Sequence, residues 1–179
     1  LNRFKQFSTI LSDMKSNDIE NIIAELGQWE NIVSAMIYFQ KKVCILNNWP
    51  YAELWLPDKT NKFMTWAGYW SNKEEYFEKF TKYSSCFKFP KGIGLIGRVW
   101  QQNELQWVND ISRDKNILRI ELAVKSKLNS AICFPIIYNS DVRLILSFFM
   151  EDINDIDLKN ANVIFSFSNK IGKIIESMR

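Results

Sequence analysis

The sequence predicts an α+β fold in which an antiparallel sheet of five or six strands carries the N- and C-terminal helices packed on one face. Both ends of the chain show apolar residues at alternating spacings of three and four, which is the period of an amphipathic helix. Between them, short segments alternate apolar and polar residues and are joined by turn sequences, as in hairpins. Hairpins with helices at both ends favour an α+β architecture over alternating parallel units.

The N-terminal part is predicted to form two helices, over residues 2–15 and 18–46. Their apolar seams are out of phase and comprise Phe4, Phe7, Leu11 and Met14 in the first helix, then Ile19, Ile22, Leu26, Trp29, Val33 and Met36 in the second. The break falls at "KSND", where Asn17 is expected to cap the second helix. We therefore expect residues 1–17 to be an N-terminal or linker helix and residues 18–179 to be one domain.

Strands and helices follow one another from Asn48 onward. The predicted strands are "WPYAELWLPD", "KFMTWAGYW", the edge strand "CFKFPK", "LQWVND", "SAICFPII" and "VRLILSFFM". The predicted helices are "NKEEYFEKFTKY", "DKNILRIELAVKSK" and a last helix from Asp157. In the first strand, Tyr51, Glu53 and Trp55 alternate with apolar residues and therefore share one face.

The glycines of "FPKGIGLIGRVWQQNELQWVND" have the spacing of a dinucleotide-binding turn. Gly92, Gly94 and Gly97 spell G-x-G-x-x-G, and Asp114 follows 20 positions after Gly94. That fingerprint requires a buried parallel strand before the turn and a full helix after it. Here Pro90 and an alternating pattern precede the turn, and only about two helical turns fit before the next strand. The context argues against a dinucleotide-binding role for the glycines.

Composition excludes several classes of protein. The 179 residues carry a formal net charge of +3 with no basic cluster, so nothing indicates nucleic-acid binding. No apolar run approaches the ~20 residues of a membrane span and no signal peptide is visible, so we expect no membrane association and a cytoplasmic location. The chain opens on Leu1 rather than methionine, and we expect it to be an excised piece of a longer protein.

The chain contains no histidine and three cysteines, Cys44, Cys86 and Cys133. The absence of histidine removes the commonest general base, metal ligand and haem ligand, as well as any histidine kinase phosphoacceptor in this chain. The cysteines are far apart in sequence, so we predict no metal site of the zinc type and no catalytic residues. An iron–sulfur cluster remains an alternative if the fold brings the three thiols together.

Several segments, in order, resemble a GAF domain. They are "WPYAELWLPD", "FPKGIGLIGRVWQQNELQWVNDI", "SAICFPI" and "LILSFFMEDIND", and the likeness covers about residues 25 to 178. It is nearest to the GAF domains of bacterial and cyanobacterial sensor histidine kinases and cyclases. The resemblance implies a sensory or regulatory module of a larger signal-transduction protein, such as a two-component system, with the output domain outside this chain.

The resemblance also offers a structural explanation of the glycine segment. Gly92 and Gly94 would let the backbone enter a short helix with unusual dihedral angles, and Gly97 would let that helix pack closely. Trp100 is expected in the core. We expect Arg98 to form an ion pair with a loop acid such as Asp110, with an anion ligand as the alternative.

The residues match none of the better-defined GAF subtypes. Bilin-binding members attach their chromophore through a cysteine in the helix equivalent to "DKNILRIELAVKSK", which has none, or through an Asp-x-Cys-Phe sequence. Here Cys86 and Phe87 are present but Ser84 replaces the aspartate. The cyclic-nucleotide signature is absent, and the cysteines do not reproduce the pattern of the sulfoxide reductases. The cofactor therefore stays unknown, with an iron–sulfur or bilin sensor as the alternative, and no enzyme is predicted.

By resemblance, a ligand would lie between the sheet and the elements that cover it. The aromatic candidates for this contact are Trp55, Trp66, Trp70, Phe87, Phe89, Trp107, Phe134 and Phe148. About half should face the ligand side, because alternate residues of a strand point in opposite directions. We further expect a homodimer through the helical seams and the terminal helix, with signals passing as tilts or rotations of these helices.

Overall fold

Six antiparallel strands form one sheet in the order β3-β2-β1-β6-β5-β4, as seen in the computed structural model, which describes residues 15–178. The strands are β1 (Tyr51–Pro57), β2 (Met64–Ser71), β3 (Lys88–Phe89), β4 (Gln106–Val108), β5 (Ser130–Tyr138) and β6 (Asp141–Met150). Each predicted strand is present, and "CFKFPK" contributes the edge strand β3. The predicted antiparallel sheet is therefore confirmed.

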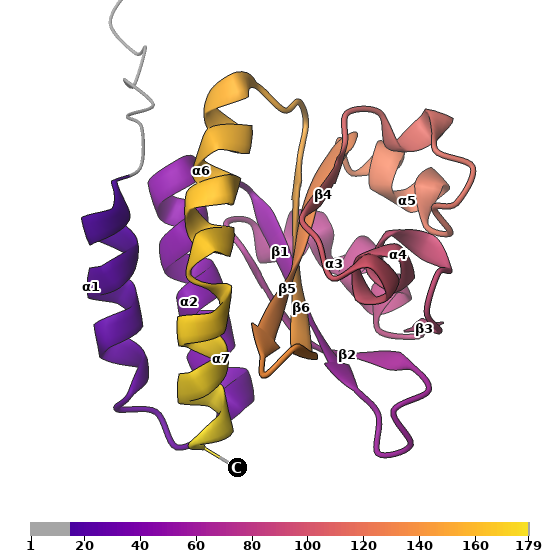
Figure 1. Ribbon diagram of the computed structural model, residues 1–179. Helices are drawn as coiled ribbons and strands as arrows, with labels where there is room; N and C mark the ends of the chain where they lie inside the picture. Colours follow the sequence, from indigo (N-terminus) through magenta and orange to yellow (C-terminus); the bar gives the residue numbers. More distant parts are fainter. Residues whose placement is uncertain (1–14, 179) are drawn as a thin grey trace, which may run out of the picture.

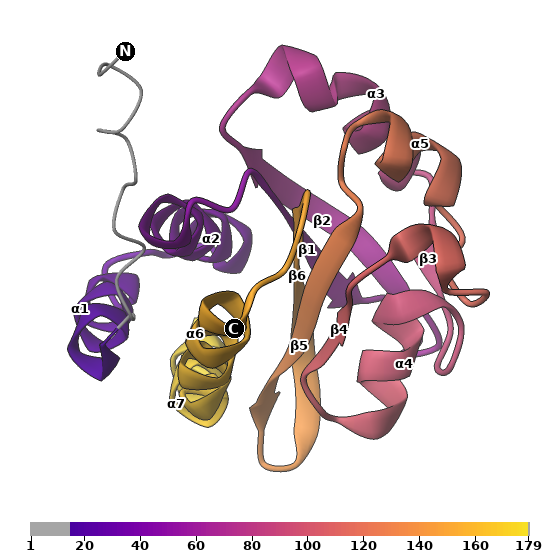
Figure 2. The ribbon, with the colours of Figure 1, turned by 90° about the horizontal axis from the view of Figure 1, so that it is seen from above.

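Helices cover both faces of the sheet (Figure 1). They are α1 (Ser16–Leu26), α2 (Ile32–Asn47), α3 (Glu74–Ser84), α4 (Gly94–Gln102), α5 (Ile120–Lys125), α6 (Asp155–Ser166) and α7 (Ser168–Glu176), with a 3-10 turn η1 at Ile111–Arg113. Figure 2 shows α1, α2, α6 and α7 on one side and α3, α4 and α5 on the other. None of the helices within residues 15–178 has the length and apolar character needed to span a bilayer.

The predicted helix over residues 18–46 is in fact two helices. Helix α1 ends at Leu26, with Gly27 as its C-cap. Helix α2 begins after Asn31, whose side chain accepts a hydrogen bond from the Ser34 amide at 3.1 Å. The chain reverses between them, so α1 packs against α2 and α6 (Figure 2). The predicted cap at Asn17 is wrong, because α1 already begins at Ser16. The predicted helix over 2–15 lies almost wholly outside the described residues.

The sheet separates two hydrophobic cores. One lies between the sheet and α1, α2, α6 and α7, and we call that side of the sheet the α2/α7 face. The other lies beneath α3, α4, α5 and the loops, and we call its side the α3–α5 face. Strand β1 contributes to both: Ala52 and Leu54 are buried on the α2/α7 face, Tyr51 and Trp55 on the other. This alternation is what the two-residue period of the sequence predicts.

The C-terminal helix begins two residues earlier than predicted and is interrupted at Phe167. Asn154 is its N-cap, and its side-chain oxygen accepts hydrogen bonds from the amides of Ile156 at 2.9 Å and Asp157 at 3.0 Å. A side chain that satisfies free amides at a helix start stabilises the helix.

Replacing Asn154 by alanine is expected to lower the free energy of unfolding by about 1 kcal/mol, because these two amides lose their acceptor. Urea denaturation would measure the change. Asn162→Ala is the matched control, since Asn162 is an exposed residue inside α6 and alanine favours helix there. Equal effects of the two substitutions would contradict the capping role of Asn154.

Candidate functional site

A fully buried carboxylate lies at the centre of the α3–α5 face. Glu53 follows Tyr51 and precedes Trp55 on the same side of β1, and the Glu53 side chain is 0% exposed. Strand β1 lies between β2 and β6, so Glu53 is held in the middle of the sheet. Burial of a carboxylate is costly unless a charge partner and hydrogen bonds compensate it.

The partner of Glu53 is Arg119, the residue that precedes α5. Arg119 Nη1 donates to both carboxylate oxygens of Glu53, at 2.6 and 2.8 Å, and also to the hydroxyl of Ser84 at the end of α3. The Arg119 side chain is only 7% exposed. The two charges therefore neutralise each other inside the core, across 66 positions of sequence.

Aromatic rings surround the guanidinium group. The Arg119 Cζ atom lies 5.2 to 5.7 Å from the ring centroids of Trp55, Phe80, Phe89 and Phe149. Rings at this distance attract a cation through the negative charge of their faces. Glu53 and these four aromatic residues together form what we call the cation cage.

Further hydrogen bonds position Glu53. The Trp55 Nε1–H donates to Glu53 at 3.3 Å, and the Tyr51 hydroxyl lies 3.4 Å from Glu53 and 2.9 Å from the Thr81 hydroxyl. Burial and the neighbouring Glu53 charge raise the pKa of Tyr51 well above its usual range. Tyr51 therefore stays protonated and available as a donor to the carboxylate.

Two polar groups beside the cage have no hydrogen-bond partner in the described structure. The Ser147 hydroxyl oxygen is buried, and Ser147 lies directly opposite Glu53 in the β1–β6 pairing, so the two share a face. The buried Nε1 of Trp66 is likewise unpartnered, and Trp66 lies opposite Trp55 in the β1–β2 pairing. Unsatisfied buried polar groups are uncommon in native proteins, and a bound water or ligand is one of the explanations for them.

The free space next to Arg119 is small. A cavity of about 20 Å³ lies between Arg119, Phe89, Leu95 and Ile117. That volume holds about one water molecule. While Arg119 occupies the cation cage, no organic ligand of ordinary size fits at this position.

The glycine segment holds the loop that leads to Arg119. The Asn116 side chain accepts from the Gly94 amide at 2.9 Å and donates to the Gly92 carbonyl at 3.0 Å. Arg98 donates to both carboxylate oxygens of Asp114, at 3.1 and 2.6 Å. The expected structural ion pair of Arg98 therefore exists, but its partner is Asp114 and not Asp110.

The glycines have the structural roles expected of them. Gly92 and Gly94 have φ values of 82° and 68°, which side-chain-bearing residues rarely adopt. A Cβ on Gly97 would lie 2.2 Å from the Pro90 carbonyl oxygen, so α4 packs against this loop only with glycine there. The Gly92 amide donates to the Gly97 carbonyl at 2.7 Å, and the Gly94 amide is bound by Asn116. Both amides are thus engaged within the protein, unlike those of a phosphate-binding turn.

Replacing Asp114 by asparagine is expected to lower the free energy of unfolding by about 1–2 kcal/mol at pH 7. Hydrogen bonding from Arg98 holds the pKa of Asp114 below its usual range. A carboxyl with a depressed folded pKa stabilises the fold above its unfolded pKa of about 3.9, and this contribution is lost as pH falls through the folded value. The difference between the two proteins should therefore shrink below about pH 4, as urea titrations at several pH values would show.

The matched control for that experiment is Glu121→Gln. Glu121 pairs with Lys125 on the surface of α5, where both side chains are largely exposed. Exposed pairs contribute little to stability. An equal loss in both variants would argue against a structural role for the Arg98–Asp114 pair.

The structure divides the eight predicted aromatic site residues between the two faces. Trp55, Trp66, Phe87 and Phe89 belong to the core of the α3–α5 face. Those on the α2/α7 face are Trp70, Phe134 and Phe148. Trp107 is 49% exposed on the edge strand β4. Only Trp55 and Phe89 belong to the cation cage, and ligand contact by any of the eight stays a prediction.

Sequence reasoning missed the polar part of the site, Glu53 and Arg119 with Ser84, Thr81 and Ser147. One signal was available for Glu53, because it is the single charge between Tyr51 and Trp55 on one face of a strand. A lone charge flanked by aromatic residues on a buried face requires a partner. Nothing in the sequence identified Arg119 as that partner.

The three cysteines do not converge. Cys44 lies in the core of the α2/α7 face, Cys133 in that of the α3–α5 face, and Cys86 is exposed after α3. Burial raises the pKa of the Cys44 and Cys133 thiols well above their usual range, the Glu53 charge adding to the effect at Cys133. Within residues 15–178 no group of three cysteine, aspartate or glutamate residues is arranged to hold a metal ion. The geometry therefore does not supply the ligands of an iron–sulfur cluster from these thiols.

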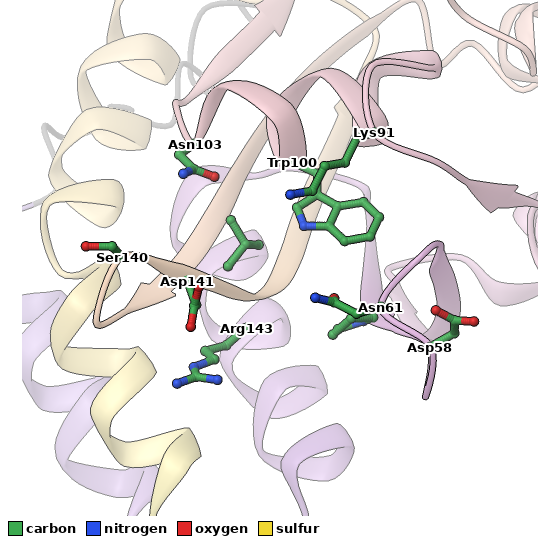
Figure 3. A pocket seen from close by; sticks show the side chains of 10 residues that line it. Asp58, Asn61, Lys91, Trp100, Asn103, Ser140, Asp141 and Arg143 are labelled. Atoms are coloured by element: carbon green, nitrogen blue, oxygen red, sulfur yellow. The ribbon is translucent and has the colours of Figure 1, made fainter.

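A second, open hollow of about 380 Å³ lies between the β1–β2 turn, α4 and the β5–β6 turn (Figure 3). Three of its charged groups already interact with other groups of the protein. The Asp58 carboxylate accepts hydrogen bonds from amides of its own turn, Lys91 Nζ lies 5.2 Å from the Trp100 ring centroid, and Arg143 lies 3.4 Å from Glu176. The cation cage, with its unpartnered neighbours, is the stronger candidate site.

Comparison with known proteins identifies the family. The family model described as the GAF domain matches residues 41–176, while no curated protein sequence matches the chain significantly. Among solved structures, free methionine-R-sulfoxide reductase from Neisseria meningitidis in complex with its substrate is 15% identical with a TM-score of 0.73, covering 94% of each chain.

Two solved GAF domains are about equally similar. The A. aeolicus nlh2 GAF domain in an inactive state is 14% identical with a TM-score of 0.71, covering 91% of this chain and 96% of its own. The GAF domain from Acinetobacter phosphoenolpyruvate-protein phosphotransferase gives the same identity and TM-score, covering 93% and 95%. At such identities these likenesses show the fold, and with the match of the family model they establish that this chain belongs to the GAF domain family.

Proposed function

We propose that this chain is a non-catalytic sensory or regulatory module that binds a small molecule on the α3–α5 face of its sheet. The observation that carries the proposal is the charged and hydrogen-bonding site within an otherwise aromatic core, formed by Glu53, Arg119 and the unpartnered Ser147 hydroxyl. The cage lies between the sheet and the elements that cover it, where the resemblance to GAF domains implies a ligand. The cofactor or ligand in the organism is unknown.

Energetics support a role beyond stability for this charged pair. Replacing a buried ion pair by apolar residues of similar volume is often neutral or stabilising. The surrounding Trp55, Phe80, Phe89 and Phe149 already form an apolar core into which such residues would fit. A ligand site that needs a charge explains why a carboxylate is retained there.

The two-faced structure of β1 provides a route for the signal. Glu53 is part of the cage on the α3–α5 face, while its neighbours Ala52 and Leu54 face the core that contains α2. A ligand that shifts Glu53 would shift these neighbours with it, because all three belong to one strand segment. Helices α2 and α7, which contact the sheet, would then tilt or rotate.

Native mass spectrometry of the protein purified from its own host tests the proposal. We expect a retained small molecule, released by unfolding, and a melting temperature that rises when the compound is added back. A ligand-free protein whose melting temperature responds to no compound of a broad metabolite library would contradict ligand sensing.

The proposal includes the absence of catalysis, although several structural neighbours are methionine sulfoxide reductases. Cys44 and Cys133 are buried in different cores and their thiols are held protonated, which disfavours thiolate chemistry. We expect no turnover of free methionine-R-sulfoxide in the presence of a thiol reductant. Turnover that is lost when Cys86 is replaced by serine would contradict this.

We also propose that the protein forms a homodimer, through a surface other than the helical seams predicted from the sequence. The seam residues Ile19 and Met36 are 0% exposed within one chain, so they do not offer an interface. Ile45 and Leu46 at the end of α2 are 59% and 49% exposed. Light scattering of the wild type and of Ile45→Ser/Leu46→Ser would test the dimer, since a monomeric wild type at high concentration removes it.

A further inference from the structure

We infer that the cation cage is a binding site for a small organic cation that carries a guanidinium or ammonium group, and that Arg119 is a built-in occupant which this ligand displaces. The inference rests on the proposed function and names the chemical class of its ligand. Four observations carry it: the buried Glu53, the ring cage, the unpartnered Ser147 hydroxyl, and the position of Arg119 on a covering loop.

The two members of the ion pair differ in how they are held. Glu53 lies on a strand paired on both sides, and both its neighbours pack in the opposite core. Arg119 lies between a loop and the six-residue helix α5, and the preceding Leu118 is 48% exposed. Moving Arg119 outward requires only a rearrangement of the covering loop, whereas moving Glu53 would break the sheet. The carboxylate is therefore fixed and the guanidinium is the displaceable partner.

The charge left behind determines which ligand can replace Arg119. Once Arg119 leaves, Glu53 is a buried carboxylate surrounded by ring faces, and both features favour a cation. The hydroxyls of Ser84 and Ser147 can accept hydrogen bonds from additional N–H groups, and Ser147 has no partner at present. An anionic ligand in the same place would leave Glu53 uncompensated and add a second negative charge.

The loop contacts suggest how displacement would be limited. Asn116 and Asp114 tie the loop to the glycine segment and Arg98, on the far side of Arg119 from α5. The remaining free cavity of about 20 Å³ cannot take a ligand beside Arg119. The ligand and the Arg119 side chain therefore cannot occupy the cation cage together, so the ligand must compete with a tethered guanidinium and its apparent affinity is reduced accordingly.

The first experiment removes the occupant and supplies the free ion. Arg119→Ala is titrated with guanidinium chloride up to about 10 mM and its melting temperature is compared with titrations of urea and of sodium chloride. Urea has the shape of the ion without its charge. We expect the melting temperature to rise with the logarithm of guanidinium concentration in the variant and to rise much less in the wild type, where Arg119 competes for the cage. Urea and sodium chloride should cause no rise in either protein.

The double variant Arg119→Ala/Glu53→Gln is the matched control. It carries neither charge of the Glu53–Arg119 pair. Its affinity for guanidinium should be roughly 10- to 100-fold lower than that of Arg119→Ala, which corresponds to the loss of a hydrogen bond to a charged group. A folded Arg119→Ala that does not respond to guanidinium would overturn the inference. An equal response in the double variant, or an equal response to urea, would do the same.

A second experiment uses the unaltered protein and does not depend on the variant being folded. Hydrogen exchange of residues 110–120 is followed with alkylguanidines, alkylamines, and neutral and anionic compounds of similar size. We expect cations that raise the melting temperature to speed exchange in this segment as Arg119 leaves the cage. A neutral or anionic ligand that stabilises the protein with no change in this segment would leave the sensory function intact and reject the cation cage as its site. No response to any compound would instead reject the proposed function.

Discussion

Replacing Glu53 by glutamine is expected to lower the free energy of unfolding by about 3–5 kcal/mol. The amide keeps the shape of the side chain but removes the charge that compensates Arg119, whose guanidinium is only 7% exposed. The Trp55 and Tyr51 groups that point at the carboxylate also lose a charged acceptor. Urea denaturation followed by circular dichroism would measure the loss.

The double variant Glu53→Gln/Arg119→Met is the control for this substitution. Methionine is unbranched and fills irregular aromatic surroundings well, so removal of both charges should restore most of the stability lost in the single variant. Recovery would show that the cost comes from the uncompensated guanidinium rather than from packing around residue 53. A double variant as unstable as the single one would show instead that the carboxylate itself is needed by its other donors.

Replacing Gly97 by alanine is the second substitution with a large expected effect, about 1–3 kcal/mol of lost stability or more. The new methyl carbon would lie 2.2 Å from the Pro90 carbonyl oxygen and 3.2 Å from the Gly92 nitrogen. Both are backbone atoms, so α4 would have to move away from the loop that it holds. Because the Asn116 side chain, in the segment that leads to Arg119, hydrogen-bonds to Gly92 and Gly94, hydrogen exchange in residues 110–120 should also increase.

Gly27→Ala serves as the control for Gly97→Ala. A Cβ on Gly27 meets no atom within 4 Å, and the backbone there has φ −64°, which alanine adopts freely. We expect a gain of about 0.4–1 kcal/mol, because alanine reduces the freedom of the unfolded chain. Similar losses at both positions would contradict a packing role specific to Gly97.

Local patterns in the sequence predicted most of the strands and helices. The two-residue period of "WPYAELWLPD" placed Tyr51 and Trp55 on one face and Leu54 on the other, as the structure shows. The long N-terminal helix was wrong, because its seam continues with the same spacing through Gly27 and Trp29. Apolar spacing indicates that residues share a face but does not indicate where the chain reverses. Here the chain reverses before Asn31, whose side chain caps the start of the second helix.

The candidate site was less predictable than the fold. Aromatic residues on strands were recognised as candidates, yet Phe134 and Phe148 face the α2/α7 core while Phe89 faces the cage. Assigning a face requires the register of each strand, and an extra residue in β2, Ala67, shifts the pairing of β2 with β1, so that Trp66 and Trp70 lie on opposite faces. A single-residue change of register reverses the face of every residue beyond it.

The sequence by itself determined the order of the elements, the antiparallel sheet, the family, and the need for glycine at Gly92, Gly94 and Gly97. The elements and the sheet follow from local periodicity, which depends on neighbouring residues, whereas the family and the roles of the glycines follow from the resemblance of several segments to GAF domains. Only the tertiary structure decided that Glu53 meets Arg119, that Arg98 meets Asp114, and that the cysteines stay apart. Such pairings depend on how strands and loops distant in sequence are brought together, and a charge shows its need for a partner without showing which residue provides it.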